Sequence, residues 1–179
     1  GDAAIERIHD EERQLRRAAD TLKVPASELP DRIQQLQQQV KALKDQLDTA
    51  RAREAEAEAA TLAAEAVDGV VAVRRDGLTP DDLRRLAVAT RAHLDEGVVA
   101  VVGAGPDRST AGIVVAVTSG LTERASAAEI AAPAAKALGG GTAKNRELVV
   151  GGGKNVDAVE EALALVRKHA TDAVGGSGR

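Results

Sequence analysis

A glycine-rich segment with basic side chains is the part of this sequence best suited to chemistry. It runs over residues 139–153 and reads G-G-G-T-A-K-N-R-E-L-V-V-G-G-G, with Lys154 directly after it. Because glycine has no Cβ, such a segment lets a ligand approach the backbone closely, and the polar residues at 144–146 would then meet a phosphate or a ribose. The alternative is that the two glycine blocks are loops on either side of a core strand at 148–150, since glycine clusters usually mark turns.

The segment matches no common phosphate-binding motif. In G-x-x-x-x-G-K-[ST] a hydroxyl residue follows the lysine, whereas Asn155 follows Lys154 here, and G-x-G-x-x-G is absent. The candidate site is therefore a local basic cluster of Lys144, Arg146 and Lys154, extended by the arginine pair at 74–75. Such groups bind phosphates by charge, and arginine does so with two hydrogen bonds. The alternative is ordinary surface charge.

Other residue types give no catalytic or metal site. Cysteine is absent, so the chain has neither a thiolate nucleophile nor a disulfide. The three histidines, His9, His93 and His169, are isolated on predicted helices without further ligands at metal-binding spacing. The acidic pairs at 81–82 and 95–96 fall at predicted helix ends, where capping and the helix dipole explain them. We therefore expect no catalytic or metal-binding residue in this chain.

The composition limits the possible classes of protein and of partner. The 179 residues suffice for one domain with an appendage, and because Phe, Tyr, Trp, Met and Cys are absent, the core must be aliphatic. Without aromatic side chains the chain cannot stack bases as OB-fold or RRM proteins do. The net charge is −4, with 10 Lys/Arg against 14 Asp/Glu in residues 1–67, so nucleic-acid binding would need a local basic patch. No stretch is apolar enough to span a membrane, and the lack of cysteine favours a soluble, cytoplasmic protein.

The N-terminal third of the chain is predicted to be a helical hairpin. Apolar residues recur at intervals of three and four along 2–23, and this helix should end before Pro25. A second helix over 29–67 carries a coiled-coil seam. The seam consists of Leu29, Ile33, Leu36, Val40, Leu43, Leu47, Ala50 and Glu54. We expect the two helices to pack as an unequal antiparallel hairpin, and this arm, residues 1–67, is the first predicted domain.

Residues 68–174 are predicted to form a small α/β domain after a break at Asp68-Gly69. The predicted strands are 70–73, 98–102, 113–117 and 148–150. The predicted helices begin near Pro80, at Ala127 with Ser126 as the cap, and at Val156. The order β-α-β-β-α-β-α indicates a mixed sheet with helices packed on it. The glycine and serine residues at 175–179 predict a disordered tail.

Four segments, taken together and in order, carry a family resemblance. They are T-L-K-V-P-A-S-E-L-P-D-R-I at 21–33, V-D-G-V-V-A-V-R-R-D-G at 67–77, A-V-T-S-G-L-T-E-R-A-S-A-A-E-I at 116–130, and A-L-G-G-G-T-A-K-N-R-E-L-V-V-G-G-G-K at 137–154. With the long helices in front of them, they resemble the C-terminal region of alanyl-tRNA synthetases, which comprises the end of the helical segment and the DHH-associated domain. The resemblance covers almost the whole chain.

The resemblance implies a part of a class II ligase that has no catalytic site of its own. In the family this region contacts the elbow of tRNA(Ala), links the aminoacylation and editing domains, and in some members forms dimers through the helical arm. The family's ATP, magnesium and zinc sites would lie in domains outside this chain, so no cofactor is expected here. The expected partners are tRNA(Ala), the two catalytic domains and a second copy of the chain, with no membrane.

The residues expected to contact tRNA are the first glycine block and the polar positions after it. They are Gly139, Gly140, Gly141, Thr142, Lys144, Asn145, Arg146 and Lys154. The alternative function is a purely structural coiled-coil dimerisation module without nucleic-acid binding. A measurement of tRNA binding separates these two functions.

Overall fold

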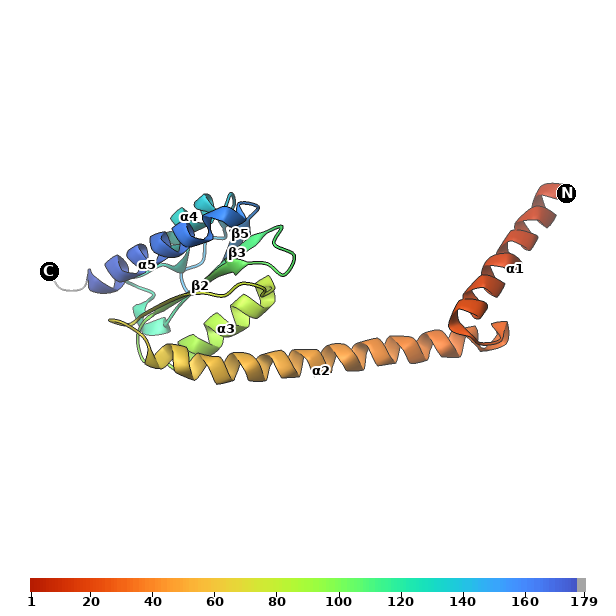
Figure 1. Cartoon of the computed structure of the whole chain (residues 1–179), viewed down its shortest axis with the longest axis horizontal. Helices are drawn as coiled ribbons and strands as arrows, with labels where there is room; N and C mark the ends of the chain where they lie inside the picture. Colours follow the sequence, from red (N-terminus) through yellow and green to blue (C-terminus); the bar gives the residue numbers. More distant parts are fainter. Residues whose placement is uncertain (177–179) are drawn as a thin grey trace. The chain divides into compact units, whose positions relative to one another are not determined.

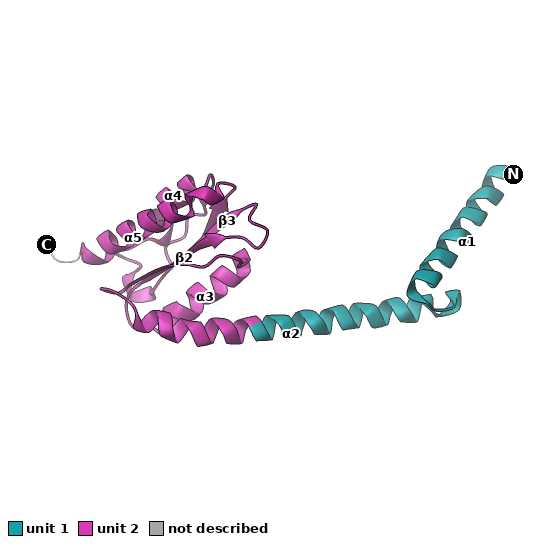
Figure 2. Ribbon diagram, viewed as in Figure 1, with its two compact units in different colours: residues 1–50 teal, residues 51–179 magenta. Residues whose placement is uncertain are grey.

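The structure, a computed structural model, describes residues 1–176, which divide into two compact units after Ala50 (Figure 2). The boundary predicted after residue 67 differs from this division, because the last turns of helix α2 (Leu29–Ala64) pack within the second unit. Ala59 and Leu62 of these turns are buried. Most of the predicted disordered tail, residues 177–179, lies outside the described residues, and Gly175 is the last residue of helix α5.

The first unit consists of helix α1 (Asp2–Leu22), a short 3-10 helix (Ala26–Glu28) and the beginning of α2. The α1 helix ends as predicted, just before Pro25. Lys23 adopts a left-handed conformation with φ of 55°, and the N–H of Val24 donates to the carbonyl of Ala19 at 3.0 Å. This hydrogen bond satisfies a carbonyl that the end of the helix would otherwise leave unpaired.

The predicted antiparallel packing of α1 against α2 is not present in the single chain. Seven large apolar residues of the two helices remain 46–63% exposed, and we call them the apolar stripe. The stripe consists of Ile5, Ile8, Leu15, Ile33, Val40, Leu43 and Leu47. A physical reason lies in α1, which places Glu12 in the middle of its apolar face, where close packing would have to bury a carboxylate.

The second unit is built on a five-stranded mixed sheet in the order β1-β2-β3-β5-β4. The strands are β1 (Val70–Arg74), β2 (Val98–Ala104), β3 (Ala111–Val117), β4 (Gly141–Thr142) and β5 (Leu148–Gly153). Strand β1 pairs with β2 in parallel, and the other neighbours are antiparallel. The mixed sheet and the β2-β3 hairpin are confirmed.

Helices cover both faces of this sheet (Figure 1). Helix α3 (Pro80–Ala92) and the end of α2 pack on one face, and α4 (Ala127–Ala137) and α5 (Val159–Gly175) pack on the other. Every residue of β2 is buried, as its continuous run of apolar residues predicts for a strand covered on both sides. The two cores are aliphatic, because the sequence offers no aromatic residue to fill them.

Two features of the sheet differ from the prediction. Strand β4 was not expected, because two residues are too short to give an alternating pattern. The second glycine block, Gly151–Gly153, continues β5 and pairs with β3 at Ala111–Ile113, where a loop was expected.

Among the residues that the structure describes, no helix is long and apolar enough to cross a membrane.

Candidate nucleic-acid interface

The glycine-rich segment folds into the edge strand β4 and its neighbour β5 at one side of the sheet. Gly141 and Thr142 form β4 and pair with Gly152 and Gly151 of β5, so the two glycine blocks face each other. The first block is exposed, and Thr142 is half-buried. The segment therefore forms an accessible edge of the second unit, as a binding surface requires.

Close backbone contacts explain why glycine is needed at this edge. A Cβ placed on Gly140 would lie 1.7 Å from the carbonyl oxygen of Gly152, and one on Gly153 would lie 1.9 Å from that of Leu138. No side chain fits at these distances. The segment that leaves α4 can therefore lie this close to β5 only because Gly140 and Gly153 have no side chain. These glycines are accounted for by packing alone, without a bound phosphate or ribose.

Asn145 acts on the backbone of its own loop. Its side-chain oxygen accepts hydrogen bonds from the N–H groups of Glu147 at 2.8 Å and Leu148 at 3.2 Å, and this contact leads the chain into β5. The carbonyl of Asn145 also accepts from the N–H of Ala128 at 3.0 Å. The amide of Asn145 therefore has a structural role that its position between two basic residues did not reveal.

Arg146 is held by the loop that precedes α4. Its guanidinium donates to the carbonyl of Thr122 at 2.8 Å and to that of Glu123 at 3.2 Å, and its own carbonyl accepts from the N–H of Ala127 at 2.9 Å. Ser126, the predicted cap, makes no side-chain capping bond. The carbonyls at 145 and 146 cap α4 instead, because they accept from its first N–H groups, which have no partner within the helix.

The side chains of Lys144 and Lys154 are exposed, and neither side chain makes a hydrogen bond or an ion pair with the described residues. They do not form one compact cluster with Arg146. Arg146 precedes β5 and Lys154 follows it, and a strand of six residues spans about 20 Å. The backbone of Lys154 lies instead beside Gly139, since a Cβ on Gly139 would be 3.9 Å from the backbone nitrogen of Lys154. The predicted site residues thus divide between the two ends of β5.

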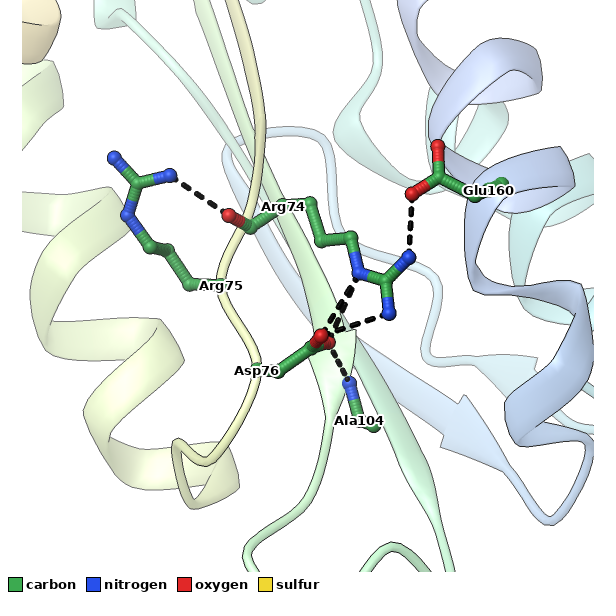
Figure 3. A network of polar contacts seen from close by, with 5 residues as sticks. All are labelled: Arg74, Arg75, Asp76, Ala104 and Glu160. Atoms are coloured by element: carbon green, nitrogen blue, oxygen red, sulfur yellow. Dashed lines mark hydrogen bonds and ion pairs between the residues drawn. The ribbon is translucent and has the colours of Figure 1, made fainter.

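The arginine pair at the end of β1 is engaged within the chain (Figure 3). The Arg74 guanidinium bonds Asp76 at 2.7–3.1 Å and pairs with Glu160 of α5, while Arg75 pairs with Glu58 of α2. The hydrogen bond from Arg74, joined by one from the N–H of Ala104, lowers the pKa of the Asp76 carboxyl, and the same bond raises the pKa of Arg74. These arginines hold strands and helices together at this end of the sheet.

Lys136 is a free cation that the motif analysis missed. It lies in the last turn of α4, it is exposed, and its side chain has no hydrogen bond or ion pair with the described residues. Its carbonyl accepts from the N–H of Gly139 at 3.0 Å, so it lies directly before the first glycine block. In the sequence, Lys136 lies only three residues before this block. It was missed because the predicted segment begins at the first glycine, Gly139.

Two further observations concern other possible sites in the second unit and along the described residues. Among residues 1–176, no group of three or more His, Asp and Glu side chains could hold a metal ion. A shallow hollow of about 300 Å³ lies at the end of the sheet, with Gly151–Gly153 and Lys154 on one side and Leu83 of α3 on another. It adds an accessible surface next to Lys154.

Comparison with known proteins relates this chain to one enzyme family. Alanine–tRNA ligases from Thermobifida fusca and Mesorhizobium japonicum are each 35% identical to it over 174 residues, and the alignments cover 92% and 93% of this chain. The crystal structure of the C-Ala domain from Aquifex aeolicus alanyl-tRNA synthetase has the same fold, with a TM-score of 0.51 over 57% of this chain and 90% of that domain, at 24% identity. The chain is homologous to the C-terminal region of alanine–tRNA ligases.

This relation to alanine–tRNA ligases confirms the family resemblance seen in the four sequence segments. The chain spans only about one fifth of these relatives, 19% and 20% of their lengths. The similarity to the C-Ala domain confirms the α/β fold. No family model matches the chain.

Proposed function

We propose that this chain is the tRNA-binding and domain-linking module of a cytoplasmic alanine–tRNA ligase. Its partner would be the elbow of tRNA(Ala), while aminoacylation and editing would be carried out by domains outside this chain, which itself would hold no catalytic site or cofactor. The observation that carries the proposal is the match to alanine–tRNA ligases along 92% of the chain.

The surface of the second unit supports binding to a phosphate backbone. Lys144 and Lys154 flank the glycine-rich edge, and both are exposed and free of partners among the described residues. A lysine ammonium that no carboxylate neutralises attracts phosphates and releases counterions when it binds them. Gly139, Gly140 and Gly141 are exposed at the edge between the two lysines, so an RNA strand can approach this backbone without side chains in its way.

A salt titration of tRNA binding tests the proposal. Replacing Lys144 and Lys154 together by Ala should weaken binding of tRNA(Ala) by the chain and flatten the dependence of log K on log salt by about one to two units. Filter binding or fluorescence polarisation with labelled tRNA gives both quantities. If the unaltered chain binds no tRNA at physiological salt, the tRNA-binding function is wrong.

The apolar stripe of the first unit supports a second role, self-association. Its seven residues are 46–63% exposed, and apolar side chains at heptad spacing on α2 are the pattern by which helices pair. A second copy of the chain would bury them. If the chain associates but binds no tRNA, the structural dimerisation module is the better description.

A further inference from the structure

The cations of the second unit fall into an engaged and a free group. Its engaged arginines donate to carboxylates or carbonyls of the chain itself. They are Arg51, Arg74, Arg75, Arg85, Arg91, Arg124, Arg146 and Arg167. Lys136, Lys144 and Lys154 are exposed and have no such bond among the described residues. These arginines are therefore committed to the fold, whereas the three lysines can change partner without breaking it.

The three free lysines surround strand β4. The carbonyl of Lys136 bonds the N–H of Gly139, the Lys154 backbone lies next to Gly139, and Lys144 comes two residues after Thr142 at the end of β4. Five residues of extended chain reach at most about 17 Å, so Lys144 and the other two lysines lie within about that distance of Gly139. Ammonium groups at the ends of flexible side chains can reach consecutive phosphates over this span.

The helix ends of this unit offer no alternative site for a phosphate. The first turn of α3 carries Asp81 and Asp82, and that of α5 carries Glu160 and Glu161, which repel an anion. The first N–H groups of α4 already donate to the loop carbonyls at 145–146. Because the sequence also lacks aromatic residues for base stacking, exposed cationic side chains are the means left to hold RNA.

We propose that Lys136, which lies outside the glycine-rich segment, joins Lys144 and Lys154 in a three-lysine surface around β4 that binds the phosphate backbone of tRNA. Arg146 is a positioning residue that holds the loop carrying Lys144. This inference rests on the proposed tRNA-binding function and extends it. Contacts of this kind are independent of base sequence, so the surface selects tRNA by the shape of its backbone.

A Lys136→Ala variant tests the inference directly. The side chain is exposed on a helix and Ala is a good helix former, so the fold is retained. Binding of tRNA(Ala) should weaken about three- to ten-fold at low salt, and the salt slope should flatten by about one unit. Lys136→Arg, which keeps the charge, should keep the slope.

Lys168→Ala is the matched control, because Lys168 is an exposed, unpaired lysine on α5, in the third turn of the helix and away from β4. It should leave affinity and slope unchanged. If the chain binds tRNA but Lys136→Ala behaves as Lys168→Ala does, this inference is overturned and the tRNA-binding function stands. If the unaltered chain binds no tRNA, the function itself fails.

Discussion

Arg146 shows how neighbours distant in sequence decide the role of a residue. Its type and its place between glycine blocks suggest phosphate binding, yet its guanidinium donates to carbonyls 23 and 24 residues away. Sequence spacing cannot reveal these acceptors, because they come close only when the loop before α4 lies beside the loop that leads into β5. The exposure of Lys144 and Lys154, by contrast, followed from their surroundings of glycine and polar residues.

We predict that Arg146→Ala and Arg146→Lys both loosen the start of α4. A lysine has one ammonium and cannot replace the fork that joins the carbonyls of Thr122 and Glu123, so retained charge should not restore the structure. A loss of about 1 kcal/mol of local stability should speed amide exchange at Ala127 and Ala128 roughly five-fold. Hydrogen exchange followed by NMR measures this.

Lys144→Ala is the control for the Arg146 variants, because Lys144 makes no bond with the described residues and should leave both amides protected. Unchanged exchange in Arg146→Ala would contradict the structural role. Full protection in Arg146→Lys together with normal tRNA binding would favour a charge contact with RNA.

Asp76 gives the fold a dependence on pH. Because the Arg74 guanidinium and the N–H of Ala104 bond its carboxylate, the pKa of Asp76 is lower in the folded chain than in the unfolded chain. The folded state then binds this proton less readily, so the stabilisation is present above the ordinary pKa of about 4 and is lost as pH falls through the folded pKa.

We therefore expect Asp76→Asn to lower the free energy of unfolding at pH 7 and to lower it less at pH 2. The side chain is 36% exposed, so solvent screening limits the effect to about 1 kcal/mol or less. Urea unfolding followed by far-UV circular dichroism at both pH values measures the difference. An equal loss at both pH values would mean that the carboxylate charge is not responsible.

At the scale of elements, periodic segments were predictable and the glycine-rich edge was not. Helices α1, α2 and α3 and strands β2 and β3 carry clear apolar patterns, and the structure has them where the sequence places them. Strand β4 has two residues and β5 ends in three glycines, so neither gives a strand pattern over its full length. Their pairing depends on contacts between α4, β3 and β5 that no local window contains.

We predict that Gly153→Ala destabilises the second unit, whereas Gly141→Ala does not. A Cβ on Gly153 would lie 1.9 Å from the Leu138 carbonyl oxygen, and relieving this overlap should cost about 1–3 kcal/mol or more. A Cβ on Gly141 meets nothing within 4 Å, so Ala there should be neutral or slightly stabilising. Thermal unfolding compares the two variants. Equal melting temperatures would contradict the close contact between Gly153 and the carbonyl of Leu138.

At the scale of the molecule, the two units differ in how far they bury their apolar residues. The second unit buries its aliphatic residues in two cores on either side of the sheet, whereas the first unit leaves its apolar stripe exposed. Heptad spacing predicted which residues form the stripe. It could not tell whether their partner is the other helix of the same chain or another chain, because both pairings use the same pattern.

We predict that the chain self-associates through the apolar stripe. Changing Val40 and Leu43 to Gln should shift sedimentation equilibrium towards monomer at micromolar concentrations, since both side chains are more than half exposed and a partner would bury them. Lys41→Gln, on the same helix but outside the stripe, is the control. A monomeric unaltered chain over the whole concentration range would rule out this association.

The loop between β4 and β5 is fastened at both ends and nowhere between. One end is fixed by the pairing of Gly141 and Thr142 in β4 with β5, and the other by the carbonyls that cap α4 at 145–146. Only Ala143 and Lys144 lie between these fixed points, so a bulky photoreactive group at either position would move freely without disturbing the fold. Illumination with tRNA bound would then mark the nucleotides that pass this edge, which turns the loop into a fixed reference for mapping the RNA.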